Sequence, residues 1–79
     1  GGEEFVVMMP KTNLDEAYTT CSQLREKVHG INHEIAGGIT SSFGVTQVHK
    51  DDTQETLFQR CDKALYTAKD NGRDRVEKI

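Results

Sequence analysis

Residues 39–79 read ITSSFGVTQVHKDDTQETLFQRCDKALYTAKDNGRDRVEKI, and this stretch decides the fold. It starts with a segment rich in β-branched residues, 39–48, which predicts a strand. Gly44 lies inside that segment, and a glycine within a strand indicates a bulge or the close approach of another backbone. Residues 76–79 close the stretch with a second, shorter strand.

The segment between these two strands predicts a helix. Apolar residues recur on one face of it at the spacing of helical turns: Leu57, Phe58, Cys61, Ala64, Leu65 and Ala68. We expect Asp52 to cap this helix, because it places Glu55 at the third helical position, as a capping box requires. Gly72 is expected to end the helix.

Another helix is predicted upstream, between residues 13 and 30. Asn13 is a suitable cap, and Glu16 lies three residues later, where it can complete a capping box. The apolar positions again share one face: Leu14, Ala17, Cys21, Leu24 and Val28. We expect Gly30 to follow the last helical turn and residues 32–38 to form a loop or a weak strand.

The first ten residues, GGEEFVVMMP, add one more strand. Residues 5–9 are an uninterrupted apolar run that Pro10 ends, so we expect a strand buried on both faces. Gly1 and Gly2 are typical of a tight hairpin turn, since glycine readily adopts positive φ. A hairpin needs two strands and the sequence holds the second alone, which indicates a piece of a larger domain, cut at its turn.

The predicted order is strand, helix, strand, helix and short strand, which is an α/β or α+β arrangement. A chain of 79 residues is at most one small domain, and its 34% hydrophobic and 29% charged residues suit a soluble globular piece. The net charge of −3 argues against non-specific nucleic-acid binding. Cys21 and Cys61 are too few for a disulfide framework or a zinc motif, so we expect reduced thiols and a cytoplasmic location.

Two pairs of charged residues could carry chemistry. Glu3 and Glu4 follow the glycine turn, where a carboxylate can bind a hard cation such as Mg²⁺ or accept a proton from a hydroxyl. Lys69 and Arg73 would share a face at the end of the second helix and could hold phosphate oxygens. Taken alone, the acidic pair is more often solvated at the surface, and the basic pair more often complements the helix dipole.

Two motifs together resemble a known family. Residues 1–5, GGEEF, match the signature hairpin for which the GGDEF family of diguanylate cyclases is named. Residues 60–76 match its closing pattern, R-x-D-x-A-L-Y-x-A-K-x-x-G-R-[ND]-R-V, and residues 40–45 resemble its T-x-S-x-G-V strand. The resemblance covers essentially the whole chain. It implies an α+β fold, an α/β sandwich of the nucleotide-cyclase palm type, with residues 1–79 as the C-terminal half of a GGDEF domain that starts at the hairpin.

The resemblance also implies a reaction. Diguanylate cyclases condense two GTP molecules into cyclic di-GMP and release pyrophosphate, and each subunit of a homodimer presents one GTP. By position, Glu3 would bind the metal, Mg²⁺ or Mn²⁺, and help to deprotonate the attacking 3′-hydroxyl, with Glu4 supporting the metal. The glycine pair would let the nucleotide lie against the backbone, and Lys69 and Arg73 would hold its β- and γ-phosphates.

The family's first half supplies a second metal-binding aspartate, a phosphate-cradling loop and the guanine-reading residues. We therefore expect the 79-residue chain alone to be inactive, and a longer protein to carry an upstream sensor or receiver domain, with membrane attachment left open. An alternative is a non-catalytic GGDEF-type module that binds GTP or a partner protein and regulates a neighbouring domain. The intact GGEEF motif with Lys69 and Arg73 favours the cyclase, while a small structural domain with chance motifs would need two coincidences.

Overall fold

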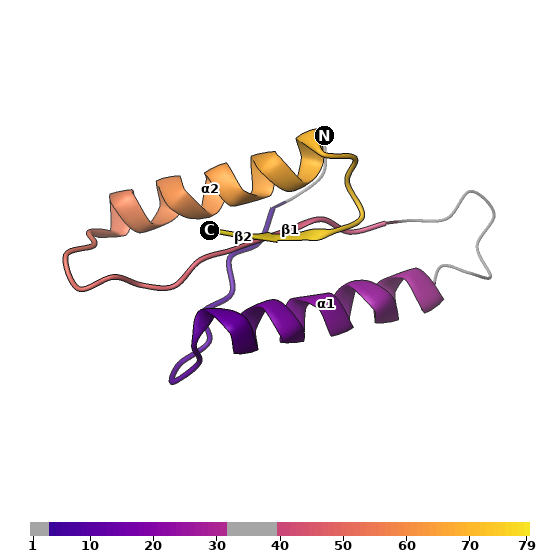
Figure 1. The fold of residues 1–79 in the computed structure, drawn as a ribbon, viewed down its shortest axis with the longest axis horizontal. Coiled ribbons are helices and arrows are strands. Elements are labelled where there is room, and N and C mark those ends of the chain that lie inside the picture. Colours follow the sequence, from indigo (N-terminus) through magenta and orange to yellow (C-terminus); the bar gives the residue numbers. More distant parts are fainter. Residues whose placement is uncertain (1–3, 32–39) are drawn as a thin grey trace.

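The computed structural model describes residues 4–31 and 40–79. Its elements are α1 (Leu14–Ile31), β1 (Phe43–Val45), α2 (Gln54–Asp70) and β2 (Val76–Lys78). The two strands lie between the two helices, so that α1 covers one face of the small sheet and α2 the other (Figure 1). This is a small α+β unit, consistent with the fold that the sequence predicts.

The sheet is a parallel pair joined by α2 as the crossover. Phe43 is opposite Val76 and Val45 is opposite Lys78. Backbone hydrogen bonds extend the pairing at both ends: the Phe43 amide donates to the Arg75 carbonyl and the Ile79 amide to the Val45 carbonyl, both at 2.9 Å. Parallel strands need such a long connection, and here the helix both supplies it and covers the sheet.

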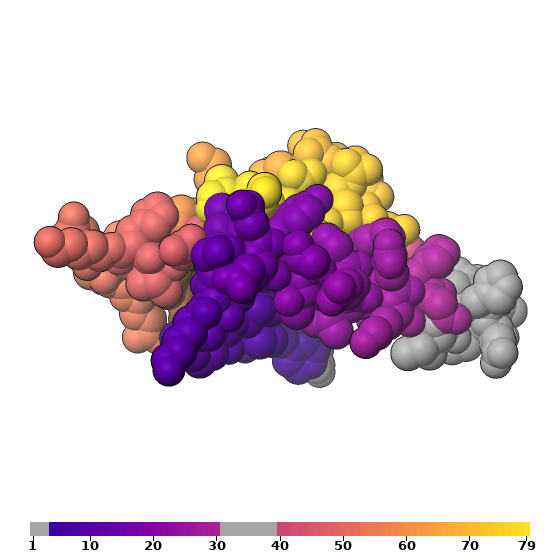
Figure 2. Space-filling view, turned by 60° about the horizontal axis from the view of Figure 1, so that its bottom comes forward, coloured from indigo at the N-terminus to yellow at the C-terminus, as the bar shows by residue number. Residues whose placement is uncertain are grey.

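Apolar packing against α1 forms the larger part of the core. Ala17 and Cys21 of α1 are buried against Val45 and Val76 of the strands. The partly buried residues around this cluster are Met9, Leu14, Tyr18 and Phe43. α1 spans much of the surface in Figure 2, with the indigo atoms of the N-terminal segment beside it. Burial of this apolar stripe fixes α1 on the sheet.

On the other face of the sheet, α2 lies almost in contact with the strand backbone. Ala64 and Ala68 are 1% and 0% exposed, and these small side chains let the helix approach closely. A Cβ added to Gly44 would overlap the backbone of Leu65 and lie 2.8 Å from the Ala64 carbonyl carbon. The close approach predicted at Gly44 is thus confirmed.

The start of α1 follows the prediction. The Asn13 side chain accepts a hydrogen bond from the Glu16 amide at 2.8 Å, and the Glu16 carboxylate accepts one from the Asn13 amide at 3.1 Å. This is the expected capping box. The helix ends later than predicted. Gly30 was expected to follow the last turn, but it lies within the helix, which runs to Ile31.

The start of α2 corrects the prediction. Its cap is Thr53, not Asp52: the Thr53 hydroxyl accepts from the Thr56 amide, and the Thr56 hydroxyl accepts from the Thr53 amide. The Asp52 carboxylate is occupied by the guanidinium of Arg60, so the helix starts one residue later. At the other end Gly72 follows the C-cap Asn71 with a φ of 120°, as expected of a helix-ending glycine.

Two predicted strands differ from those observed. Residues 5–9 form no strand, and Phe5 and Met8 are 81% and 76% exposed rather than buried. A strand requires a neighbour to exchange backbone hydrogen bonds with, and no other described segment pairs with this one. The strand predicted over 39–48 shortens to Phe43–Val45, because β2 offers only three partners.

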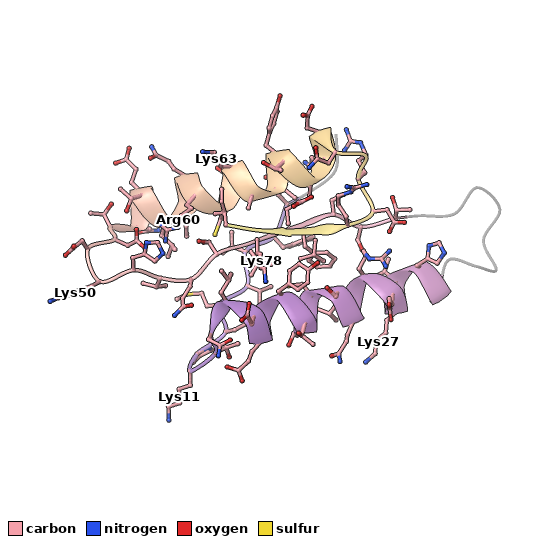
Figure 3. The ribbon with its side chains drawn as sticks, in the orientation of Figure 1. Lys11, Lys27, Lys50, Arg60, Lys63 and Lys78 are labelled. Atoms are coloured by element: carbon pink, nitrogen blue, oxygen red, sulfur yellow. The ribbon has the colours of Figure 1, made fainter. Side chains whose placement is uncertain are left out.

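Lys78 joins β2 to α1 at the edge of the sheet. Its ammonium lies 3.0 Å from the Asp15 carboxylate and 4.8 Å from the centre of the Tyr18 ring. In Figure 3 Lys78 lies between the sheet and α1, whereas Lys11, Lys27 and Lys50 point away from the molecule.

Neither of the described helices is long and apolar enough to cross a membrane.

Candidate functional site

The N-terminal segment of the chain meets the C-terminal end of α2. The segment from Glu4 onward starts beside the last turn of α2 and runs to the start of α1 (Figure 1). The Lys69 ammonium lies 3.1 Å from the Glu4 carboxylate, although 65 residues separate them. Both side chains are partly exposed, at 37% and 58%, so they can reach a ligand from solvent. The structure thus brings together two of the predicted site residues.

A groove of about 600 Å³ opens beside this pair. Its walls come from residues 4–9, from residues 40–46 and from the facing sides of α1 and α2. Glu4, Lys69 and Arg73 all line it, together with apolar residues such as Phe5, Val7, Cys21 and Leu65. Charged groups gathered near the end of α2 therefore border a largely apolar groove.

Arg73 reaches this groove from a strained turn rather than from the helix. The four-residue spacing predicts that Lys69 and Arg73 share a helical face. This prediction is wrong, because α2 ends at Asp70 and Arg73 lies beyond it. Arg73 has a φ of 61° and Asp74 a φ of 48°, immediately after the left-handed Gly72. For residues other than glycine this conformation costs on the order of 1–3 kcal/mol each, and such strain is concentrated at ligand-binding positions.

Hydrogen bonds from α1, from α2 and from the residue before β1 hold the strained turn in place. The Arg73 amide donates to the Ala68 carbonyl of α2 at 2.9 Å, and the Asp74 amide donates to the Ser42 hydroxyl at 3.1 Å. Arg25 of α1 forms an ion pair with the Asp74 carboxylate at 2.8 Å. Sequence reasoning missed this pair, because 49 residues separate its members and no local pattern signals it.

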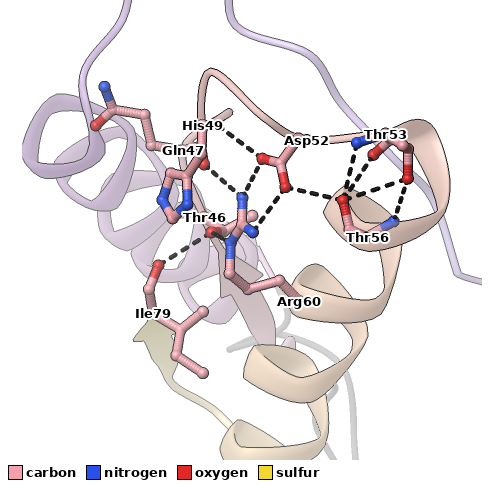
Figure 4. A network of polar contacts seen from close by, with 8 residues as sticks. All are labelled: Thr46, Gln47, His49, Asp52, Thr53, Thr56, Arg60 and Ile79. Atoms are coloured by element: carbon pink, nitrogen blue, oxygen red, sulfur yellow. Dashed lines mark hydrogen bonds and ion pairs between the residues drawn. The ribbon is translucent and has the colours of Figure 1, made fainter.

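A second polar network, around Arg60, fixes the opposite end of α2 (Figure 4). Its guanidinium binds both oxygens of Asp52, at 3.0 and 2.6 Å, and also donates to the Thr46 hydroxyl and the Gln47 carbonyl. Thr46 in turn donates to the carbonyl of Ile79. Hydrogen bonds from Arg60, and then from the His49 amide, hold the pKa of Asp52 well below its usual range. This network is a structural support for α2 and lies away from the groove residues Lys69 and Arg73.

Three of the predicted site residues, Gly1, Gly2 and Glu3, lie outside the described residues, so their roles stay predictions. Within residues 4–31 and 40–79 no three metal-ligating side chains cluster. Glu4 offers one carboxylate beside the cations, and Mg²⁺ is commonly held by one or two carboxylates together with substrate phosphates. The donor chemistry at this end of α2 therefore fits such an ion.

Neither cysteine provides a nucleophile at the groove. Cys21 and Cys61 are both free thiols, the first buried and the second half-buried. Burial raises the pKa of each thiol, which disfavours the reactive thiolate at neutral pH. Cys21 is a small apolar residue of the core, as predicted, whereas Cys61 is half-buried at the wall of the groove.

Comparison with known proteins agrees with this geometry. The family model described as diguanylate cyclase, GGDEF domain, matches residues 1–75. Diguanylate cyclase DgcP of Pseudomonas aeruginosa is 40% identical over 98% of this chain, and diguanylate cyclase DgcM of Escherichia coli K12 is 40% identical over 96% of it. The response regulator PleD of Caulobacter vibrioides is also 40% identical, over 96% of the chain. No solved structure gave a significant match.

These relatives are much longer than the chain, which spans 12% of DgcP and 18% of DgcM and PleD. The matched region nevertheless includes both the N-terminal segment and the end of α2, which meet at the groove, because the family model extends from the GGEEF motif to residue 75. Because the family model matches residues 1–75 of the 79, the chain belongs to the GGDEF family.

Proposed function

We propose that this chain is the C-terminal half of the catalytic domain of a diguanylate cyclase, which condenses two GTP molecules into cyclic di-GMP and releases pyrophosphate. One observation carries the proposal. Glu4, Lys69 and Arg73, which the sequence marks as ligands of metal and phosphate, line a single groove, and Lys69 is 3.1 Å from Glu4. A set of unrelated surface charges would not be expected to converge in this way.

The cations in the groove would bind the triphosphate. Lys69 provides a compact point charge, and Arg73 provides a planar fork that can donate two parallel hydrogen bonds to phosphate oxygens. Phosphoryl transfer needs little covalent chemistry from the protein, so positioning and charge stabilisation supply most of the catalysis. Glu4 keeps Lys69 beside the groove before the nucleotide arrives.

The acidic residues would serve the metal and the nucleophile. Glu3 and Glu4 would hold Mg²⁺ or Mn²⁺, and Glu3 would take the proton of the attacking 3′-hydroxyl. The bound ion supplies charge neutralisation at the phosphates. Gly1 and Gly2, which carry no side chains, would let the nucleotide lie against the turn.

The rest of the domain would fill the apolar groove. Residues 4–9 and 40–46 both contribute to its walls, and Phe5, Val6, Val7 and Met8 remain exposed. Within the described residues the Ser41 hydroxyl, which also lines the groove, is buried with no hydrogen-bond partner. An added strand from the first half of the domain would cover the apolar residues and offer the hydroxyl a backbone partner. Because that half supplies further metal and guanine ligands, the 79-residue chain alone should be inactive.

We propose a homodimer as the working unit, since each subunit contributes one of the two GTP molecules that are joined. A sensor or receiver domain would precede the catalytic domain, as the name of the response regulator PleD suggests for that relative. The substrate GTP and the free thiols favour a cytoplasmic location. The groove has an acidic residue beside its two cations and mostly apolar walls. A nucleic-acid site would present a stripe of basic residues, so nucleic acid is not the proposed ligand.

The test is cyclic di-GMP formation by the full-length protein and its Glu3→Gln variant, measured with GTP and Mg²⁺. We expect the wild type to make product and the variant, which keeps the shape but loses the charge, to lose at least about a hundredfold in kcat. The 79-residue chain assayed alone should make none. A full-length protein that binds GTP and makes no product, with or without Glu3, would instead support the alternative of a non-catalytic regulatory module.

A further inference from the structure

The turn that presents Arg73 is held in place by side chains that do not belong to it. Gly72, Arg73 and Asp74 are all left-handed, so the turn is not a conformation that its own backbone favours. Two side chains brace it at Asp74: the Ser42 hydroxyl accepts from its amide, and Arg25 binds its carboxylate at 2.8 Å. Both contacts act on the residue directly after the proposed phosphate ligand.

Arg25 is well placed to act as such a brace because α1 is fixed on the sheet. Ala17 and Cys21 of the same helix are 8% and 6% exposed in the core, and Leu24 lines the groove. The Arg25 and Asp74 side chains are 27% and 33% exposed, so water only partly screens the pair. The ion pair also occupies a carboxylate that would otherwise be free to attract Arg73 or to repel phosphate.

We propose that Arg25 is a positioning residue for triphosphate binding: through Asp74 it fixes the left-handed turn, keeps the Arg73 guanidinium directed at the phosphates, and so couples α1 to the phosphate site. The inference rests on the proposed function, because it assumes that Arg73 binds phosphate. It adds Arg25, a residue of α1, to the residues on which phosphate binding depends. A displacement of α1 would therefore change the affinity for the nucleotide.

The chain offers a matched control for this ion pair. Lys78 and Asp15 also join α1 to another element, at 3.0 Å, but neither of them contacts the turn or lines the groove. Breaking that pair should therefore affect packing without affecting nucleotide binding. Asp15 is 86% exposed, so Asp15→Asn is a mild change.

The experiment uses the full-length protein and 3′-deoxy-GTP with Mg²⁺, because this nucleotide keeps the triphosphate but lacks the attacking hydroxyl. We expect Arg25→Met to weaken binding roughly tenfold or more, because the misplaced Arg73 guanidinium would lose its directional, charge-assisted hydrogen bonds to phosphate. Arg25→Lys should recover part of the affinity, and Asp15→Asn should bind as the wild type does. The thermal midpoint without nucleotide is measured for every variant.

Two variants of Asp74 separate the ion pair from the backbone conformation. Asp74→Asn keeps an acceptor and tolerates positive φ, so it should bind nearly as well as the wild type. Asp74→Gly also tolerates positive φ but loses the acceptor, so it should lose affinity as Arg25→Met does. The double variant Arg25→Met with Asp74→Gly should lose no more than either single variant, because the two residues act as one unit.

Wild-type affinity in Arg25→Met, or a loss that merely follows the drop in thermal midpoint and occurs equally in Asp15→Asn, would overturn the inference. Arg73→Met is measured beside them. If Arg73→Met weakens binding and Arg25→Met does not, the positioning role fails while the phosphate site stands. If Arg73→Met also binds as the wild type does, the proposed function of the groove fails, and the inference fails with it.

Discussion

At the scale of single residues, the pair formed by Arg60 and Asp52 shows how one contact changes a local preference. Asp52 is a good helix cap by type, yet its carboxylate is 7% exposed and bound to the guanidinium of Arg60. Thr53 caps α2 instead. A residue eight positions further along the chain has thus moved the helix start by one residue. Capping patterns alone do not contain that information.

The low pKa of Asp52 predicts how stability depends on pH. The carboxylate is more acidic in the folded state than in the unfolded state, so its contribution is present above its ordinary pKa, about 4, and is lost as the pH falls below that value. Asp52→Asn should therefore be less stable than the wild type at neutral pH, and the difference should shrink as the pH is lowered. Denaturant unfolding at a series of pH values measures it.

The control for this prediction is Asp51→Asn, which changes the exposed neighbour. It should follow the wild type at every pH, apart from the small effects typical of surface charges. A constant difference between Asp52→Asn and the wild type from pH 7 to pH 2 would mean that the carboxylate charge is not what Arg60 recognises.

At the scale of elements, both helices and the short closing strand were predicted, whereas the length of β1 and the absence of a strand over residues 5–9 were not. Each helix carries its own apolar stripe and capping residues, so local sequence contains most of the signal. A strand exists only through its neighbour, and the described neighbour of β1 is three residues long. Residues 5–9 were predicted as a buried strand from their apolar run, but they have no pairing partner among the described residues, and all of them except the partly buried Met9 stay exposed.

The packing of α2 on β1 gives a prediction at this scale. Gly44→Ala would place a methyl group against the backbone of Ala64 and Leu65, which cannot move aside as a side chain can. We expect a loss of about 1–3 kcal/mol or more in the free energy of unfolding, as for an overpacked core. Denaturant unfolding of the intact domain measures this loss.

Gly30→Ala is the matched control for Gly44→Ala. Gly30 lies within α1, and a methyl group there meets nothing within 4 Å. The replacement should stabilise the helix by roughly 0.5–1 kcal/mol, because alanine has the higher helix propensity. Equal effects of the two substitutions would contradict the close packing of α2 on the strand.

At the scale of the whole molecule, the fold joins residues that are distant in sequence. The motifs predicted Lys69 and Arg73 as a pair and Glu4 as an acidic neighbour of the turn, and the groove unites all three. The strained turn after α2 and its brace from Arg25 could not be predicted, because they depend on where α1 lies on the sheet. Sequence thus predicts which charged residues line the groove, whereas the structure shows what supports the turn that carries Arg73.

The central claim is that Lys69 and Arg73 recognise the β- and γ-phosphates of a nucleotide. The most direct measurement is the affinity of the full-length protein for 3′-deoxy-GTP and for GMP, each with Mg²⁺, compared with its Lys69→Met and Arg73→Met variants. We predict that the wild type prefers the triphosphate and that each variant loses about tenfold or more of this preference, because a lost charged contact to phosphate costs roughly 1.5–3 kcal/mol. Affinity for GMP should change little. Variants that keep the full triphosphate preference would contradict the account.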